Sequence, residues 1–318
     1  MRVTRAIPAA VTGFSILAAC SQGPSPESIG KSSDALQQSV TVTLPAGIFP
    51  ADVVIGANGT LTIADRVHVL GGAEQTVNSG SGQSTFGADS IVNDVTSIGS
   101  VFLAGRASVQ GNLTTNGTIT RQSGATVSGV LTTGAHVQSN GVSWSADIPA
   151  ASAGDVSVQP DGSASRPPGR YGNVTLNSRA KLTIAPGRYF LDRLDLEPQS
   201  QLIVTPSSSD PDGSTIIYIN SDLILRAQIT SSLSTQDAVL LVYTGTNQVS
   251  IGTALSVTLV APNASVDVSS PSFAGSIFSK NATIEPGCVV QHIPFAFWDV
   301  LVPPTSTINA PSQCVASL

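Results

Sequence analysis

Apolar residues recur at every sixth position between residues 101 and 137, at Val101, Ala107, Leu113, Ile119, Ala125, Leu131 and Val137. Ser143, the next position in the series, is polar, so the pattern ends there. Side chains along a β-strand alternate between its two faces, and residues of one parity therefore point to a common side. The pattern predicts short strands whose apolar side chains stack inside a repeating coil.

The same stretch also repeats at a longer fixed period. Residues 107–124 align with residues 125–141 without gaps, so that Leu113, for example, matches Leu131. A short fixed period is typical of stacked structural units that each contact chiefly their neighbours. We therefore predict an all-β fold, a parallel β-helix or β-solenoid with coils of about 18 to 20 residues, arranged in one or two segments.

A second repeat lies further along the chain, where the letters PGRY occur twice, at Pro168 and again at Pro186. Proline fixes φ and glycine permits tight bends, so we expect the two Pro-Gly pairs to mark the same corner in successive coils. Tyr171 and Tyr189 should then lie one above the other. The spacing of later apolar residues indicates about two extra residues at a corner of the second of these coils.

The sequence divides into six parts by the presence or absence of this pattern. They are a signal peptide (1–19), a flexible polar tether (20–38), an N-terminal solenoid segment (39–143), a connector (144–165), a C-terminal solenoid segment (166–300) and a C-terminal tail (301–318). The connector holds two prolines, Pro149 and Pro160, and lacks sustained alternation, which indicates a break in the solenoid. It either separates two domains or joins two runs of coils.

The first twenty residues predict export. Two arginines precede an apolar run that is too short to span a bilayer as a helix, as in a secretory signal. The letters LAAC at 17–20 resemble the bacterial lipobox, and this resemblance implies cleavage before Cys20 and acylation of its thiol. Ser21 after the cysteine implies, by the same resemblance, an outer-membrane lipoprotein held to the membrane by its lipid. The alternative is an ordinary signal peptide in which the cysteine occurs by chance.

Charge excludes one class of partner. The whole chain has 14 basic and 20 acidic residues, a net charge of −6. Removing residues 1–19 takes away two arginines and no acid, so the mature chain has a net charge of −8. Nucleic-acid-binding domains carry a basic patch, and we therefore expect no nucleic-acid partner.

The positions of the cysteines and histidines indicate whether the chain forms a disulfide or binds a metal ion. Cys288 and Cys314 follow an export signal, and in an oxidising compartment such a pair commonly forms a disulfide. His68, His136 and His292 are scattered and no Cys-x-x-Cys spacing occurs, so we expect no metal site. The chain also lacks phosphate-binding and dinucleotide-binding motifs, and we expect no cofactor.

Two stretches carry a resemblance to known repeats. The glycine-punctuated stretch 101–141 resembles the bactofilin-like, polymer-forming solenoid repeats of bacteria. The stretch 259–290, LVAPNASVDVSSPSFAGSIFSKNATIEPGCVV, resembles the C-terminal solenoid of many exported bacterial proteins. The resemblance implies a β-solenoid fold and a structural role. The export signal and the tail beyond Cys288 depart from bactofilins, which argues against a cytoskeletal role.

One pair of acids could support catalysis. Asp195 and Glu197 are two residues apart, on the parity opposite Leu194 and Leu196, so both should point outward. Their expected separation of about 7 Å lies in the range of the two carboxylates of inverting glycosidases. Arg193 shares that face, and the alternative interpretation is a solvated acidic row moderated by arginine.

An aromatic group lies near the end of the C-terminal segment, where IPFAFWDV occupies 293–300. Trp298, with Phe295 and Phe297, could form a platform on which sugar rings stack. The alternative is a lid over the last coil, because the open end of a solenoid exposes its core and unpaired backbone groups.

From these observations we predict a lipid-anchored structural or adhesive scaffold of the cell envelope without catalytic activity. Its partners would be the membrane, through the lipid, and envelope or matrix polysaccharide or like solenoids. The alternatives are a polysaccharide-binding module with contacts at Asp195, Glu197 or Trp298, and a carbohydrate-active β-helix enzyme that uses the two acids.

Overall fold

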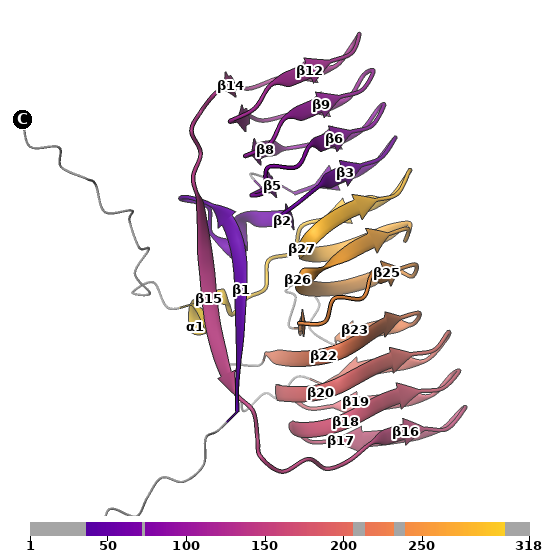
Figure 1. Cartoon of the computed structure of the whole chain (residues 1–318). Helices are drawn as coiled ribbons and strands as arrows, with labels where there is room; N and C mark the ends of the chain where they lie inside the picture. The colour runs from indigo at the N-terminus through magenta and orange to yellow at the C-terminus, as the bar shows by residue number, and fades with distance from the viewer. Residues whose placement is uncertain (1–35, 72–73, 206–213, 232–238, 303–318) are drawn as a thin grey trace, which may run out of the picture. The chain divides into compact units, whose positions relative to one another are not determined.

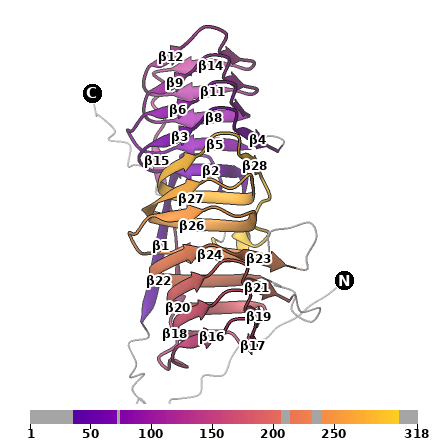
Figure 2. The same ribbon diagram turned by 90° about the vertical axis from the view of Figure 1, so that its right-hand side faces the viewer.

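The computed structural model describes residues 36–71, 74–205, 214–231 and 239–302, and these residues are almost entirely β-structure. Strands stack in parallel into a β-solenoid of about 12 turns, with 58% strand and 2% helix (Figure 1). The predicted fold class is therefore confirmed. A view turned by 90° shows the successive coils lying one on another (Figure 2).

The coils of the N-terminal segment have three faces, which we name A, B and C in chain order. Face A holds β2 (Val53–Ala57), β5 (Gln75–Asn78), β8 (Asp94–Ser97), β11 (Leu113–Thr115) and β14 (Leu131–Thr133). Face B holds β3 (Leu61–Ile63), β6 (Ser84–Phe86), β9 (Val101–Leu103) and β12 (Ile119–Arg121). Face C holds β4 (His68–Leu70), β7 (Ile91–Val92), β10 (Ser108–Val109) and β13 (Thr126–Val127). A 3₁₀ turn, η1 (Pro50–Asp52), precedes β2.

The C-terminal segment repeats the three faces with longer strands. Its strands are β16 (Val156–Val158), β17 (Ser163–Arg166), β18 (Gly169–Leu176), β19 (Lys181–Ile184), β20 (Gly187–Leu196), β21 (Gln201–Val204), β22 (Thr215–Leu225), β23 (Gln228–Ser231), β24 (Val239–Tyr243), β25 (Val249–Ile251), β26 (Leu255–Val268), β27 (Ser272–Ile284) and β28 (Val289–Gln291). The longest of them, such as β26 and β27, pass from one face to the next, and their pairing shifts register between Ala261 and Ser265.

Strand pairing confirms the period predicted for the N-terminal segment. Leu113 lies opposite Val95 in the coil before it and opposite Leu131 in the coil after it. Val95 and Leu113 point inward and are buried, as the apolar pattern predicts. The C-terminal coils vary in length: the step from Val174 to Leu194 is larger than the one from Leu113 to Leu131, whereas the step from Val266 to Ala282 is smaller.

The two copies of PGRY do not align residue by residue on neighbouring strands, contrary to the prediction from the sequence. Tyr171 pairs in register with Leu191, not with Tyr189, so the two Pro-Gly pairs are offset by two residues along neighbouring strands. A shift of two keeps side chains on the same face. The rings of Tyr171 and Tyr189 therefore still stack, 6.5 Å apart and 18° from parallel, as predicted. Each hydroxyl donates to a carbonyl four residues back, Tyr171 to Pro167 at 2.7 Å and Tyr189 to Ala185 at 2.9 Å.

The two segments form one stack, because the last coil of the C-terminal segment lies directly on the first coil of the N-terminal segment. At this junction, which we call the seam, β27 pairs in parallel with β2 and β3, and β28 pairs with β4. Ile277 lies opposite Ile55, and both are fully buried. The seam is thus a normal rung of the solenoid between residues that are far apart in the chain.

Two strands outside the coils form a ribbon along face A. β1 (Gln37–Pro45) pairs antiparallel with β15 (Ser139–Asp147) over nine residue pairs without a bulge. Side chains on one side of the ribbon, such as Val40, Val42 and Trp144, are buried, whereas those on the other side, such as Ser39 and Ser145, are exposed. The N-terminal segment predicted to begin at residue 39 therefore begins with a strand of the ribbon and not with a coil.

The stretch 144–165, interpreted from the sequence as a connector that breaks the solenoid, does contain strands. It holds the end of β15, the whole of β16 and most of β17, so the coils resume before residue 166. β16 and β17 are short, and their outward residues include Ser157 and Ser163. Such brief alternation among polar residues and prolines is too weak a signal to be recognised without the coil that stacks on it.

The ribbon buries a second hydrophobic cluster between itself and the outer surface of face A. Phe190, Tyr218, Val242, Val260 and Phe278 point out of the solenoid into this cluster, and they follow one another along paired strands. The column continues across the seam to Val77 of the N-terminal segment, which is also in the cluster. The ribbon therefore packs on both segments at once and stabilises the seam between them.

The aromatic stretch at 293–300 joins this second cluster and does not cover an open end. Phe295 and Trp298, at the start of the short helix α1 (Trp298–Leu301), are buried in it. The predicted lid over the last coil is wrong, because that coil is already covered by β2, β3 and β4 at the seam.

Candidate functional site

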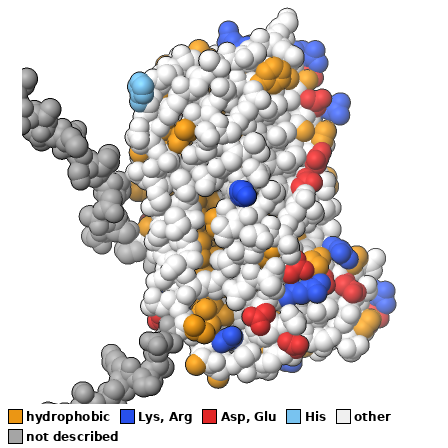
Figure 3. Space-filling model, in the orientation of Figure 1, with side chains coloured by type: hydrophobic (Ala, Val, Ile, Leu, Met, Phe, Trp, Pro, Cys, Tyr) orange, Lys and Arg blue, Asp and Glu red, His pale blue; other side chains and the backbone are white. Residues whose placement is uncertain are grey.

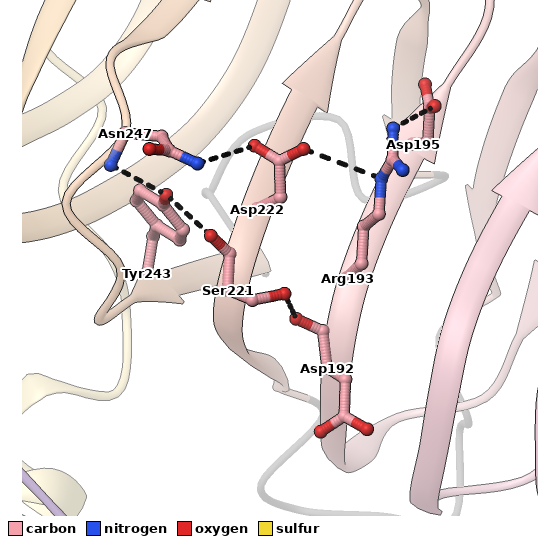
Figure 4. A network of polar contacts seen from close by, with 7 residues as sticks. All are labelled: Asp192, Arg193, Asp195, Ser221, Asp222, Tyr243 and Asn247. Carbon is pink, nitrogen blue, oxygen red and sulfur yellow. Dashed lines mark hydrogen bonds and ion pairs between the residues drawn. The ribbon is translucent and has the colours of Figure 1, made fainter.

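Asp195, one of the two acids singled out in the sequence, lies at the edge of a polar network on face B (Figure 4). Arg193 of β20 donates from Nη2 to Oδ2 of Asp195 at 2.8 Å. Its Nε lies 3.5 Å from Oδ2 of Asp222, the residue that pairs with Arg193 on β22. The guanidinium thus bridges two carboxylates from neighbouring coils, and all three side chains are partly exposed.

The network continues through the next coil by hydrogen bonds. The side-chain amide of Asn247 donates to Asp222 at 3.5 Å, and its backbone N–H donates to the hydroxyl oxygen of Tyr243 at 3.2 Å. That hydroxyl donates to the carbonyl of Ser221 at 3.2 Å, and the Ser221 hydroxyl donates to the carbonyl of Asp192 at 2.6 Å. These contacts hold the bends of three successive coils together (Figure 4).

Glu197 belongs to a different set of contacts from Asp195. Its Oε2 accepts from the backbone N–H of Ser178 at 2.9 Å and lies 3.4 Å from the Ser178 hydroxyl. Glu197 therefore caps a turn of the coil below, whereas Asp195 pairs with Arg193. The structure places both acids on the outside of the solenoid, as predicted, and gives each its own partner.

Trp298 presents no ring face to a ligand. It is 4% exposed and lies edge-on to Trp144, Phe278 and Phe295, with ring centroids 5.6 to 5.9 Å apart. Edge-to-face contacts of this kind stabilise buried aromatic clusters. In the structure, the residue predicted as a sugar contact anchors α1 against the ribbon.

Cys288 is a thiol inside the solenoid. It follows β27 at the corner before face C, where backbone hydrogen bonds place it in an inward column of small residues with Val67, Ser90 and Ala107. Its thiol donates to the carbonyl of Val268 at 3.4 Å, and burial raises the pKa of the thiol. Cys20 and Cys314 lie outside the described residues, so lipidation at Cys20 and a disulfide between Cys288 and Cys314 stay predictions.

His292 lies beside the seam. Its backbone N–H donates to the carbonyl of Leu70 at 2.8 Å, and its Nδ1 lies 3.4 Å from Oε1 of Glu74. Desolvation lowers the pKa of the imidazole, and the nearby Glu74 carboxylate opposes this shift. Among the residues that the structure describes, no three His, Cys, Asp or Glu side chains are grouped closely enough to hold a metal ion.

Sequence reasoning missed two groups of charged residues at the corner between faces B and C, one in each segment. The backbone φ is positive, 58° to 65°, at five of these charged residues: Arg66, Asp89, Arg106, Asp161 and Arg179. Arg106 donates two hydrogen bonds to Asp89 and lowers the pKa of that carboxyl, and Arg179 does the same to Asp161. The signal that could have found these ion pairs is an Asp followed by an Arg one coil later.

Comparison with known proteins adds no relative to this picture. No family model, no curated protein and no solved structure matches the chain. Within the described ranges, no helix has the length and apolar character needed to cross a membrane.

Proposed function

We propose that the protein is a lipid-anchored structural or adhesive scaffold of a bacterial cell envelope, without catalytic activity of its own. The observation that supports this most is the seam, which makes two runs of coils into one stack and so extends each outer column of side chains from one segment into the other. On face B the outward column contains, in stacking order, Ser157, Thr175, Asp195, Ile224, Ser250, Asp267, Thr283, Thr62, Thr85, Phe102 and Thr120.

The character of this surface suits many weak contacts. Most side chains of the column carry a hydroxyl group. Much of the molecular surface visible in Figure 3 is likewise neither charged nor hydrophobic. Small-molecule sites are usually concave and apolar with a few convergent polar groups. An extended row of hydroxyls instead favours contact with a long polymer or with another protein surface, as expected of a scaffold.

A polysaccharide-binding module is the second candidate, and the same row supports it, since Phe102 interrupts the hydroxyls with a partly exposed aromatic ring. A carbohydrate-active enzyme has the least support. It would require Asp195 and Glu197 to act on one glycosidic bond, and each is engaged by its own partner, Arg193 and Ser178.

Anchoring is tested by Cys20→Ser, with Cys288→Ser as the control at a cysteine that lies inside the solenoid. We expect labelled fatty acid on the parent and on the control but not on Cys20→Ser, which should leave the membrane fraction. Unlabelled parent protein that still sediments with membranes would contradict the anchor.

The scaffold role is tested separately in cells that lack the gene and with the purified chain. We expect altered adhesion or envelope integrity in the cells, and no turnover of pectic, chitinous or peptidoglycan substrates by the protein. Specific retention on one polysaccharide would favour the binding module. Cleavage that disappears in Asp195→Asn would favour the enzyme.

A further inference from the structure

The two ends of the stack differ in how their last coil is covered. The upper end in Figure 1 is formed by β12, β13 and β14, each of which pairs on one side with β9, β10 or β11. The lower end is formed by β16 and β17, which pair with β18 and β19. Within the described residues, no further coil covers either end.

The lower end is protected. Val156 and Val158 on β16 point inward and are only 4% and 5% exposed, although they belong to the last coil. Arg166 on β17 occupies an inward position, opposite buried Ile184, and lines the same small apolar cavity as Val156. An inward-pointing charged side chain on a terminal strand is one of the devices by which proteins prevent further strand addition.

The upper end carries a comparable charge, since Arg121 of its terminal strand β12 pairs with buried Leu103, but its apolar side chains are covered far less. Leu131 of β14 stands in the inward column of Leu113, yet it is 45% exposed, and its neighbour Val130 is 67% exposed. Ile119 and Val127, which also pack against the core, are only partly buried. This end therefore offers apolar interior side chains and unpaired strand edges together, a combination that favours pairing with another chain.

We propose that the upper end docks on the upper end of a second copy of this chain and closes a two-fold dimer. The seam shows that the end of one run of coils in this protein can be completed by another run, with Ile55 and Ile277 buried between them. Charge does not oppose the contact, because Arg121 is the only Asp, Glu, Lys or Arg between residues 107 and 146. Two such ends can approach without a cluster of like charges between them.

The protected lower end explains why the contact closes at two chains. A head-to-tail contact between upper and lower ends would repeat without limit and produce a filament. The covered side chains of β16 leave that contact little apolar surface to bury. An isologous contact between two upper ends uses the same surface on both copies and leaves no further upper end free.

The test uses the full chain with Cys20→Ser, so that no lipid is attached, and measures its mass by sedimentation equilibrium over a range of concentrations. We expect two chains for this parent and a single chain when Leu131→Lys is added. Phe49→Lys is the matched control, because Phe49 is also a large exposed apolar residue, at 61%, but lies in the turn after β1. We expect this control to keep two chains.

Val130→Lys gives a second variant at the same end, in case Leu131→Lys alters the far-ultraviolet circular dichroism or the unfolding temperature. It should also reduce the mass to one chain. A single chain for the parent at every concentration, a mass that keeps growing with concentration, or a dimer that persists in both lysine variants at the upper end would each overturn the proposal. The experiment is independent of the anchored scaffold role, since the chain carries no lipid.

Discussion

At the scale of single residues, the corners decide how closely successive coils can approach. Between faces A and B, Gly59, Gly82 and Gly99 stack, so that a Cβ on Gly99 would overlap the carbonyl oxygen of Gly82. Glycine near the corners was predictable from the repeat. The charged residues at the corner between faces B and C were not, because Arg66 and Asp89 adopt a left-handed conformation that the sequence pattern assigns to glycine.

We expect Gly99→Ala to lower the free energy of unfolding by about 2 kcal/mol or more, because the carbonyl it meets is backbone and cannot move aside easily. Gly105→Ala is the matched control, since its new Cβ would make only ordinary contacts, 3.6 Å or more from Ser123 and Gln122. The control should change stability by no more than about 0.5 kcal/mol. Urea denaturation measures both variants, and equal losses would contradict this account of the corner.

His292 predicts a pH dependence of stability. Its imidazole has a pKa below the ordinary value of 6.5 in the folded chain, so the unfolded state binds the proton first as the pH falls. The free energy of unfolding should be unaffected by this group above about pH 7 and should decrease as the pH drops below 6.5 toward the folded pKa. Glu74 and Asp52 lie near enough to oppose the shift.

The measurement compares the parent with His292→Gln by urea denaturation between about pH 7.5 and about pH 5. We expect the parent to lose more stability than His292→Gln over this window. His136→Gln changes an exposed histidine and serves as the control, with a pH profile like that of the parent. Identical profiles for all three proteins would contradict burial of a neutral His292.

At the scale of strands, the sequence predicts coils wherever the same side-chain period repeats locally. Val95, Leu113 and Leu131 show this, since each meets its partner at the matching position of the next coil. The sequence could not distinguish the strands of the ribbon from the strands of the coils. Alternation of apolar and polar residues along β1 and β15 looks the same whether the partner strand is parallel or antiparallel. The sequence analysis identified Arg193 and Asp195 of the polar network but not Asp222. Asp222 pairs with Arg193 through a register shift between β20 and β22, which the sequence pattern does not reveal.

Trp144→Ala tests whether the ribbon depends on its inward side chains. The change removes a buried ring that contacts Trp298, and we expect a loss of about 3 to 5 kcal/mol in the free energy of unfolding. Ser145→Ala, on the exposed side of the same strand, should have little effect. Faster proteolysis within β1 or β15 of Trp144→Ala would locate the damage. Equal stability of the two variants would argue that the ribbon packs only loosely on face A.

At the scale of the whole solenoid, the order of coils in space differs from their order in the chain. The coils begin at β16, run to β28, cross the seam to β2 and end at β14. No local pattern could predict this, because Ile55 and Ile277 carry no mutual signal beyond being apolar. The sequence predicts the first run of coils as far as residue 143, which is past its last strand β14 and inside β15, and it places the restart at residue 166, after β16 instead of at it.

We expect the seam and the ribbon to hold the chain together after its backbone is cut. A protease site inserted between Ala150 and Ala151, both exposed and outside any strand, would separate the N-terminal segment with its ribbon from the C-terminal segment. The two fragments should elute together from a sizing column under native conditions and separate in urea. Ile277→Asp, which places a charge in the seam, should let them separate without urea. Separation of the unsubstituted fragments would contradict the seam.

The seam also sets the order of events during synthesis. The strands β2, β3 and β4 leave the ribosome early, but β27 and β28, which cover them, are made only after all the other coils. Contacts between such distant residues form slowly, and edges left unpaired meanwhile are prone to aggregation. β1 and β15 can pair once residue 147 has emerged, well before the seam closes. Until the seam closes, the N-terminal segment thus keeps its first coil uncovered, with unpaired strand edges that favour aggregation.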